Sequence, residues 1–96
     1  MSDFNRVKEN LARLEIYVPV VARVHGDSHP EFHEVRRVYD AIAAKIKAAG
    51  TSKPDLESEF KKLREITDDY TVPPDVCETY AAVYNMLAEL DAAYWA

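Results

Sequence analysis

Three histidines and one cysteine are the side chains of this sequence with the clearest potential for metal or thiol chemistry. His25, His29 and His33 follow one another at intervals of four residues, with Asp27 and Glu31 between them. Two histidines four residues apart on a helix share one face, an arrangement that zinc sites use. The glutamate that a zinc protease needs directly after the first histidine is missing. We therefore interpret the three histidines as candidate ligands of a weak metal site, or alternatively as capping groups of a turn with His33 facing solvent.

Cys77 is the sole cysteine of the chain, so it forms no intrachain disulfide. We expect it in the first turn of the last helix, where the helix dipole favours the thiolate, although Asp75 and Glu78 oppose this effect. Cys77 is thus a candidate site of redox or nitrosyl chemistry. The alternative is a small apolar side chain packed on a helix.

Apolar residues recur at helical spacing in four segments, which predicts four amphipathic helices. The first covers roughly residues 3–24, and glycine or proline signals separate it from the other three. The inward rows are Phe4, Val7, Leu11, Leu14, Val18 and Val21; Phe32, Val35, Tyr39, Ile42, Ile46 and Ala49; Leu56, Phe60, Leu63, Ile66 and Tyr70; and Val76, Tyr80, Val83, Leu87, Leu90 and Tyr94.

The boundaries of these helices have local explanations. Pro19 predicts a kink inside the first helix, and Gly26 predicts its end in a left-handed conformation. The Ser28–Glu31 segment matches a capping box and predicts the start of the second helix, which Gly50 ends. Because the loops are short, neighbouring helices should run antiparallel. The sequence therefore predicts an all-α protein, an up-down-up-down antiparallel four-helix bundle forming a single domain over residues 1–96.

Composition excludes several classes of function. The chain has 96 residues, of which 48% are apolar, and a net charge of −5. The negative charge disfavours both nucleic acids and anionic membrane surfaces. No apolar run approaches the roughly 20 residues that span a bilayer, and no secretory signal is visible. We expect a cytoplasmic protein that binds neither nucleic acid nor membrane.

Two stretches of the sequence resemble the C-terminal domain of the di-iron iron–sulfur-cluster repair proteins, a branch of the hemerythrin-like family. The first runs from Leu63-Arg64-Glu65-Ile66-Thr67-Asp68-Asp69-Tyr70-Thr71 through Pro73, Pro74 and Cys77 to Thr79-Tyr80-Ala81-Ala82-Val83-Tyr84. The second, residues 24–32, is similar to that family's first interhelical turn. The resemblance implies a hemerythrin-like bundle with two irons inside one end. It implies as ligands a histidine early on helices one and three and a His-x-x-x-Glu late on helices two and four.

The positions that correspond to these ligands carry other residues. By spacing, the helix-one histidine falls at Phe4, the helix-two pair at Ala49 and Lys53, and the helix-three histidine also near Lys53. Both counts meet at Lys53 because the segment between helices two and three is shorter here. The helix-four histidine falls one position beyond Ala96. An aromatic ring, a methyl group and an ammonium do not bind iron, so the resemblance implies a degenerate relative with no iron cofactor at the family site.

Two functions remain open. The first is a metal-free, non-enzymatic bundle that acts by association or regulation, as a homodimer or with a complete repair protein. In this hypothesis Tyr94 and Trp95 fill the former metal pocket or form an association surface. The second is an iron-binding protein in iron–sulfur cluster repair, or in nitric-oxide or oxidative stress defence. Its ligands would come from a second chain or from carboxylates that lack histidine partners: Glu57, Glu59, Glu89 or Asp91.

Other chemistry has little support in the sequence. A small-molecule binder that uses the former iron cavity is a third hypothesis, although no residue pattern indicates its ligand. The sequence contains no phosphate-binding loop, no nucleophile elbow and no paired base. We therefore favour a protein without enzymatic activity.

Overall fold

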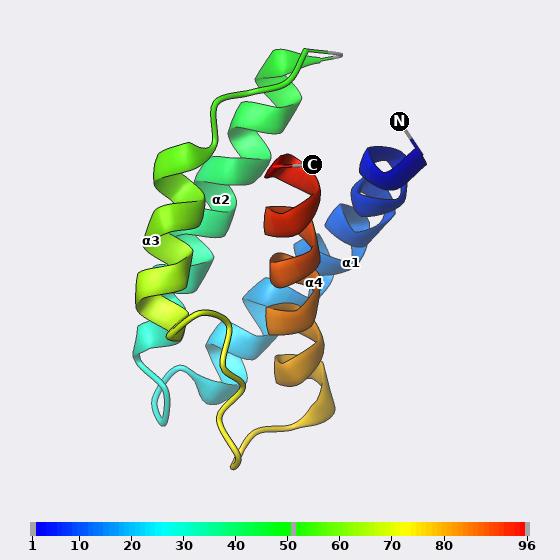
Figure 1. Ribbon diagram of the computed structural model, residues 1–96. Helices are drawn as coiled ribbons and strands as arrows, with labels where there is room; N and C mark the ends of the chain where they lie inside the picture. The colour runs from blue at the N-terminus through cyan, green and yellow to red at the C-terminus, as the bar shows by residue number, and fades with distance from the viewer. Residues whose placement is uncertain (1, 51, 96) are drawn as a thin grey trace.

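Four helices make up most of the protein. The computed structural model describes residues 2–50 and 52–95, and the side chains of residues 9–50 and 52–95. The helices are α1 (Ser2–His25), α2 (Glu31–Ala49), α3 (Glu57–Thr67) and α4 (Glu78–Trp95). Each runs antiparallel to the one before it, and α1 packs against both α2 and α4 while α3 packs against α2 (Figure 1). The predicted all-α, up-down-up-down bundle is confirmed.

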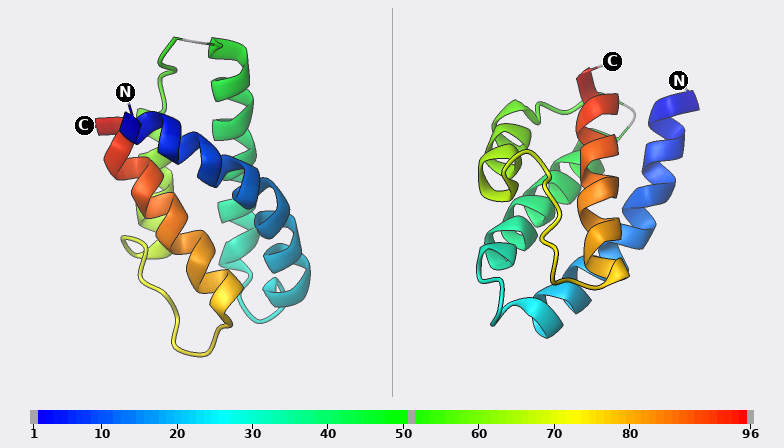
Figure 2. Two further views of the ribbon diagram at one scale, coloured as in Figure 1. Left: turned by 90° about the vertical axis from the view of Figure 1, so that its right-hand side faces the viewer. Right: turned by 60° about the horizontal axis from the view of Figure 1, so that its bottom comes forward.

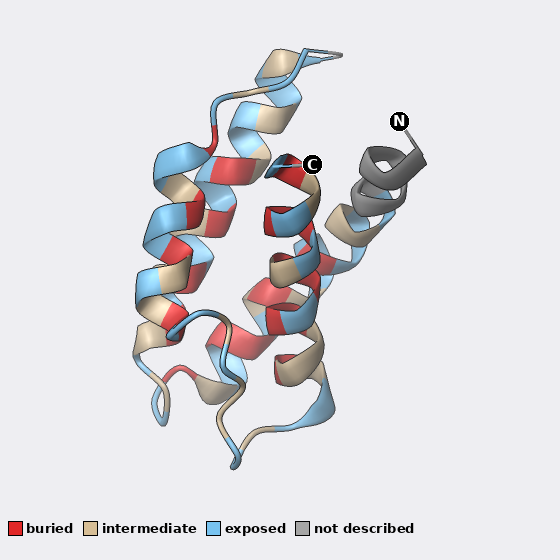
Figure 3. Cartoon of the chain, viewed as in Figure 1, coloured by how far each residue is buried: buried red, intermediate tan, exposed pale blue. Residues whose placement is uncertain are grey.

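The predicted apolar rows supply most of the core. Buried residues lie on the inner faces of all four helices (Figure 3). Among the described side chains, helix α4 contributes the largest share, because Tyr84 and Met86 are buried beside its predicted row. Phe4 and Val7 lie outside the residues whose side chains are described. The members of the predicted rows that are buried are Leu14, Val18, Val21, Phe32, Val35, Tyr39, Ile42, Leu56, Phe60, Leu63, Tyr80, Val83, Leu87, Leu90 and Tyr94.

Helix α1 continues through Pro19 and changes direction along its length (Figure 2, left). Proline has no N–H to donate to the carbonyl of Glu15, and its ring crowds that carbonyl. The bend has this local cause. It lets a helix of 24 residues follow the curved surface of the other three.

Two glycines follow helices for different reasons. Gly50 ends α2 as predicted: it has a positive φ of 60° and donates its N–H to the carbonyl of Lys47. Helix α1 ends directly before Gly26, as predicted, but the left-handed conformation expected for Gly26 is wrong, since its φ is not positive. Gly26 is required by close approach instead. A Cβ atom there would lie 2.3 Å from the carbonyl oxygen of Ala22 and 2.5 Å from the ring of His33.

The predicted capping box at the start of α2 does not form. Pro30 occupies the N-cap position, and no side chain caps the helix. The carboxylate of Glu31 bonds to His29 instead. Helix α4 also begins later than expected, so Cys77 precedes its first turn rather than lying within it.

The connection from α3 to α4 opens with three consecutive residues at positive φ: Asp68, Asp69 and Tyr70. Aspartate tolerates this conformation, whereas tyrosine does so at a cost. The hydroxyl of Thr67 accepts a hydrogen bond from the Tyr70 N–H at 2.8 Å and donates to the carbonyl of Leu63. These bonds fix the departure of a connection that later carries Asp75 and Cys77.

Candidate functional site

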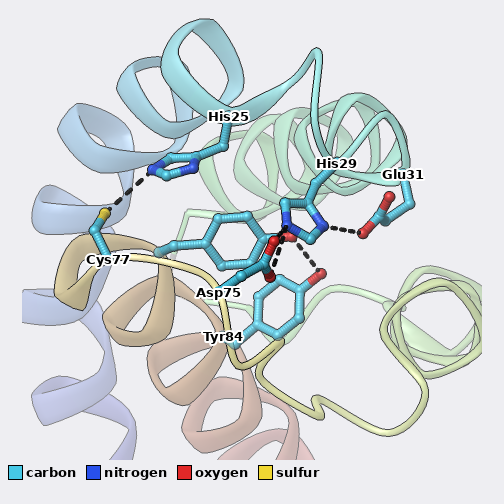
Figure 4. A network of polar contacts seen from close by, with 7 residues as sticks. His25, His29, Glu31, Asp75, Cys77 and Tyr84 are labelled. Atoms are coloured by element: carbon cyan, nitrogen blue, oxygen red, sulfur yellow. Dashed lines mark hydrogen bonds and ion pairs between the residues drawn. The ribbon is translucent and has the colours of Figure 1, made fainter.

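The polar side chains of two distant loops meet at the end of the bundle opposite the chain termini (Figure 4). His29 lies at the centre of this group. Its Nδ1 is 3.0 Å from Oε2 of Glu31, and its Nε2 is 3.2 Å from Oδ1 of Asp75. The α1–α2 turn supplies the histidine, and the α3–α4 connection supplies Asp75. An imidazole between two carboxylates thus joins two segments 46 positions apart in sequence.

Electrostatics favour the charged form of His29. The hydrogen bond that His29 donates to Glu31 raises the pKa of His29 above its ordinary value of 6.5, and Asp75 adds to this effect against a smaller desolvation penalty. Both ring nitrogens are engaged by carboxylates. Protonated His29 therefore acts as a clamp between the two loops.

His25 and Cys77 form a second pair in the same region. Nε2 of His25 lies 3.2 Å from Sγ of Cys77, and the thiol is exposed. An imidazole at this distance can take the proton of a thiol, which is how histidine activates cysteine nucleophiles. Cys77 also directly precedes α4, so the positive end of the helix dipole faces it. The arrangement can support attack by a thiolate on an electrophile or a disulfide.

The ring of Tyr80 supports both imidazoles. It meets His25 edge-on at 5.5 Å and His29 at 5.4 Å, measured between ring centroids. Its hydroxyl lies 3.2 Å from that of Tyr84, and both rings are buried. Burial raises the pKa of Tyr80 and of Tyr84, so both phenols stay neutral near pH 7. Tyr80 and Tyr84 therefore provide a rigid platform rather than an acid or a base.

His33 does not join His29 in a shared site. It is exposed, and its ring packs against the backbone of Gly26. Within residues 9–50 and 52–95, no three histidine, cysteine or acidic side chains form a group that could hold a metal ion. The weak metal site suggested for His25, His29 and His33 stays a prediction.

The opposite end of the bundle brings Lys53 and Tyr94 together. The Lys53 ammonium donates a hydrogen bond to the Tyr94 carbonyl and lies 4.5 Å from the centroid of its ring. The Tyr94 hydroxyl accepts a bond from the N–H of Leu56 at 3.0 Å, and its ring packs on Phe60. Ala49 is partly buried and offers a methyl group. The side chain of Phe4 lies outside the described residues.

Asp91 is a nearly buried acid beside this end, 6% exposed. Its Oδ2 accepts hydrogen bonds from the Tyr70 hydroxyl at 2.7 Å and from Nε of Arg64 at 3.0 Å. Its Oδ1 accepts one from the indole N–H of Trp95 at 2.8 Å. Three donors thus occupy both oxygens of a residue that the iron hypothesis would use as a ligand.

The other carboxylates of the iron hypothesis are dispersed. Glu59 pairs with Lys45 at 2.8 Å, and this hydrogen bond lowers the pKa of Glu59. Glu89 accepts a bond from the side chain of Asn10, and Glu57 is exposed at the start of α3. These residues do not converge with Asp91. Iron binding by them in a single chain would need a rearrangement.

Trp95 is the most solvent-exposed of the aromatic side chains described at this end, 53% exposed. It meets the Tyr94 ring edge-on at 5.0 Å, and the guanidinium of Arg64 lies 5.9 Å from its centroid. A shallow hollow beside it is also lined by Lys53, Pro54 and Glu57. Tyr94 is an interior residue, whereas Trp95 is available to a partner.

Sequence reasoning singled out Cys77 and the histidines but not their partners. The pairs His25–Cys77 and His29–Asp75 join residues 52 and 46 positions apart. No local spacing signals such contacts. The clearest indication in the sequence was that both segments lie in turns, which the antiparallel topology places at one end.

Comparison with known proteins gives a distant relation. The chain is 24% identical to an iron–sulfur cluster repair protein, ScdA, of Staphylococcus haemolyticus (strain JCSC1435), over 116 residues that cover 88% of this chain and 52% of the relative. The chain thus spans about half the length of this curated relative. Because 116 exceeds the 96 residues present here, the relative contains segments with no counterpart in this chain.

Two other searches gave no match. No family model matches the chain. No solved structure matches it significantly. Within residues 2–50 and 52–95, no helix is both long and apolar enough to cross a membrane.

Proposed function

We propose that this protein is a metal-free relative of the iron–sulfur cluster repair proteins that acts by binding another protein. The observation that carries the proposal is the placement of Lys53. Its ammonium caps the end of α4 and covers the ring of Tyr94, at the end of the bundle where a hemerythrin-like protein would hold two irons. A fixed cation there repels a second cation, and an ammonium has no lone pair to donate.

The neighbouring side chains support the same function. Tyr94 and Phe60 fill the interior at this end with aromatic rings, and Asp91 is saturated by three donors. The described residues therefore do not fit a di-iron centre. Iron enters this proposal only as the cofactor of a possible partner.

The distant relation to a repair protein supports the biological setting. The relative is named for iron–sulfur cluster repair, and this chain covers only about half of it. We propose that the chain associates with a complete repair protein and modulates it. Trp95, exposed beside the capped end of α4, is the aromatic anchor that such an interface would use.

A titration followed by light scattering tests this proposal. The purified chain is added to the iron-loaded repair protein of the same organism, and the mass of the complex and its iron content are measured. We expect a complex whose iron stays with the repair protein. Trp95→Ser should weaken it about tenfold, whereas Lys61→Ser, an exposed change on α3, should not. Absence of a complex, or transfer of iron to this chain, would contradict the proposal.

A further inference from the structure

Helix α1 carries a row of exposed apolar side chains on its outer surface. Ile16, Val20 and Val24 are 65%, 37% and 61% exposed, and they follow one another at intervals of four residues. Valine and isoleucine are poorer helix formers than the residues that usually fill exposed positions, so helix formation does not account for them. Single exposed apolar residues are ordinary, but a continuous row of three on one helix indicates a contact surface.

Opposite charges stand at the two ends of this row. Arg13 precedes Ile16 by three residues, and Asp27 follows Val24 by three. Both are exposed, and neither forms an ion pair with another described residue. The Gly26 N–H bonds to the Ala22 carbonyl, so the helical path continues to the edge of the turn that contains Asp27.

The spacing of five residues on α1 and the turn that follows it is the same in both directions along the chain: Arg13, Ile16, Val20, Val24 and Asp27. The intervals are three, four, four and three, centred on Val20. A two-fold axis at Val20 would pair α1 with an antiparallel copy, because such an axis brings each position against its mirror position. Ile16 would then meet the partner's Val24, and Arg13 would meet the partner's Asp27. A parallel pairing would instead place Arg13 against Arg13 and Asp27 against Asp27.

We propose that two copies of this chain associate through their α1 helices in this antiparallel register. The charges favour this occupant, since the antiparallel register produces two Arg13–Asp27 pairs by symmetry, whereas the parallel register produces two like-charge contacts. Rows of residues four apart are the ridges that pack helices across one another. A groove beside Ile16, also lined by Ala43 and Ile46 of α2, can receive the partner's Val24.

This inference goes beyond the proposed function, and neither depends on the other. Self-association through α1 uses none of the residues of the proposed function, since Lys53 lies between α2 and α3 and Trp95 lies on α4. A monomeric chain that binds the repair protein would refute the dimer alone. A dimer that takes up iron would refute the proposed function alone.

Analytical ultracentrifugation of the full chain, at concentrations up to roughly 100 μM, tests the inference. We expect a monomer–dimer equilibrium in the wild type and at least a ~10-fold weaker dimer in Val20→Asp. Arg13→Asp and Asp27→Arg should each weaken the dimer. The double variant Arg13→Asp with Asp27→Arg should restore it, because the pair is reformed with its charges exchanged.

Control measurements separate this interface from loss of folding. Circular dichroism should show the same helix content in every variant, and Lys61→Glu on α3 should dimerise like the wild type. A wild-type monomer at the highest concentration overturns the proposal. So does a dimer that Val20→Asp leaves intact, which would place the interface elsewhere. A double charge exchange that stays as weak as the single variants would overturn the antiparallel register.

Discussion

The ammonium of Lys53 lies 4.5 Å from the centre of the Tyr94 ring and donates a hydrogen bond to the carbonyl of the same residue, 41 positions away in sequence. A cation near the C-terminus of a helix complements the negative end of its dipole. Lys53 therefore closes α4 with its charge.

Lys53→Met should lower the free energy of unfolding by about 1 kcal/mol, because it removes both the cap on α4 and the cation–π contact. Urea denaturation followed by circular dichroism measures the change. Lys47→Met is the matched control, because Lys47 is exposed and its ion pair with Glu15 is long, at 3.9 Å. This substitution should change the free energy of unfolding by less than ~0.5 kcal/mol. Equal effects of the two substitutions would show that Lys53 does not cap the helix.

Asp91→Ala should be the more damaging change, lowering the free energy of unfolding by about 3 kcal/mol. It leaves the partly buried hydroxyl of Tyr70 and the indole of Trp95 without their acceptor, and Arg64 without its counter-charge. Arg64 is partly exposed and can be rehydrated, which keeps the loss at the lower end of the range for buried pairs. The exposed Asp40→Ala is the control. A loss below ~1 kcal/mol for Asp91→Ala would mean that this network contributes little.

Stability should fall as pH rises from 6 to 8. Glu31 and Asp75 raise the pKa of His29, so the folded protein holds this proton more tightly than the unfolded chain does. The contribution of protonated His29 to the free energy of unfolding is fully present below its pKa of 6.5 in the unfolded chain. It is lost as pH rises through the higher pKa of the folded protein. Thermal unfolding at a series of pH values measures the slope.

His29→Asn should flatten the pH dependence between 6 and 8, while His33→Asn should preserve it, because His33 forms no ion pair with another described residue. An unchanged slope in His29→Asn would show that the clamp between the two loops does not control stability in this range.

Cys77 should react faster with iodoacetamide in the wild type than in His25→Phe, by about tenfold at pH 7. The reason is the imidazole nitrogen 3.2 Å from its sulfur, which can accept the thiol proton. The phenylalanine keeps the edge contact with Tyr80 and removes only the base. His33→Phe is the control and should leave the rate unchanged. Identical rates in His25→Phe and the wild type would assign the contact a structural role alone.

The helices were predictable because their information is local. Rows of apolar residues at helical spacing fixed which faces of α2 and α4 are buried, and Gly50 marked the end of α2. The conformation of Gly26 was not predictable, because a glycine after a helix is explained equally well by a left-handed backbone or by a close contact. Only the approach of His33 and the Ala22 carbonyl distinguishes the two.

The polar pairs were less predictable because they depend on how the turns at one end of the bundle meet. The contacts of His25 with Cys77 and of His29 with Asp75 depend on the packing of α1, α2 and α4. Because α4 begins at Glu78, Cys77 lies directly before the helix and not, as expected from the sequence, within its first turn. The exposed row Ile16, Val20 and Val24 on α1 was not predicted either. The helical periodicity identifies the buried face of α1 and carries no comparable signal for apolar residues that face outward.

The central claim, that this protein works without iron, is tested most directly by its metal content. The purified protein is loaded with ferrous iron under anaerobic conditions, desalted and analysed by plasma mass spectrometry, with circular dichroism to verify its helices. We predict far less than ~1 iron per chain, because Lys53 and the saturated Asp91 leave no fitting donor set among the side chains described at that end. A stable content of about two irons per chain would contradict the account and restore a di-iron repair function.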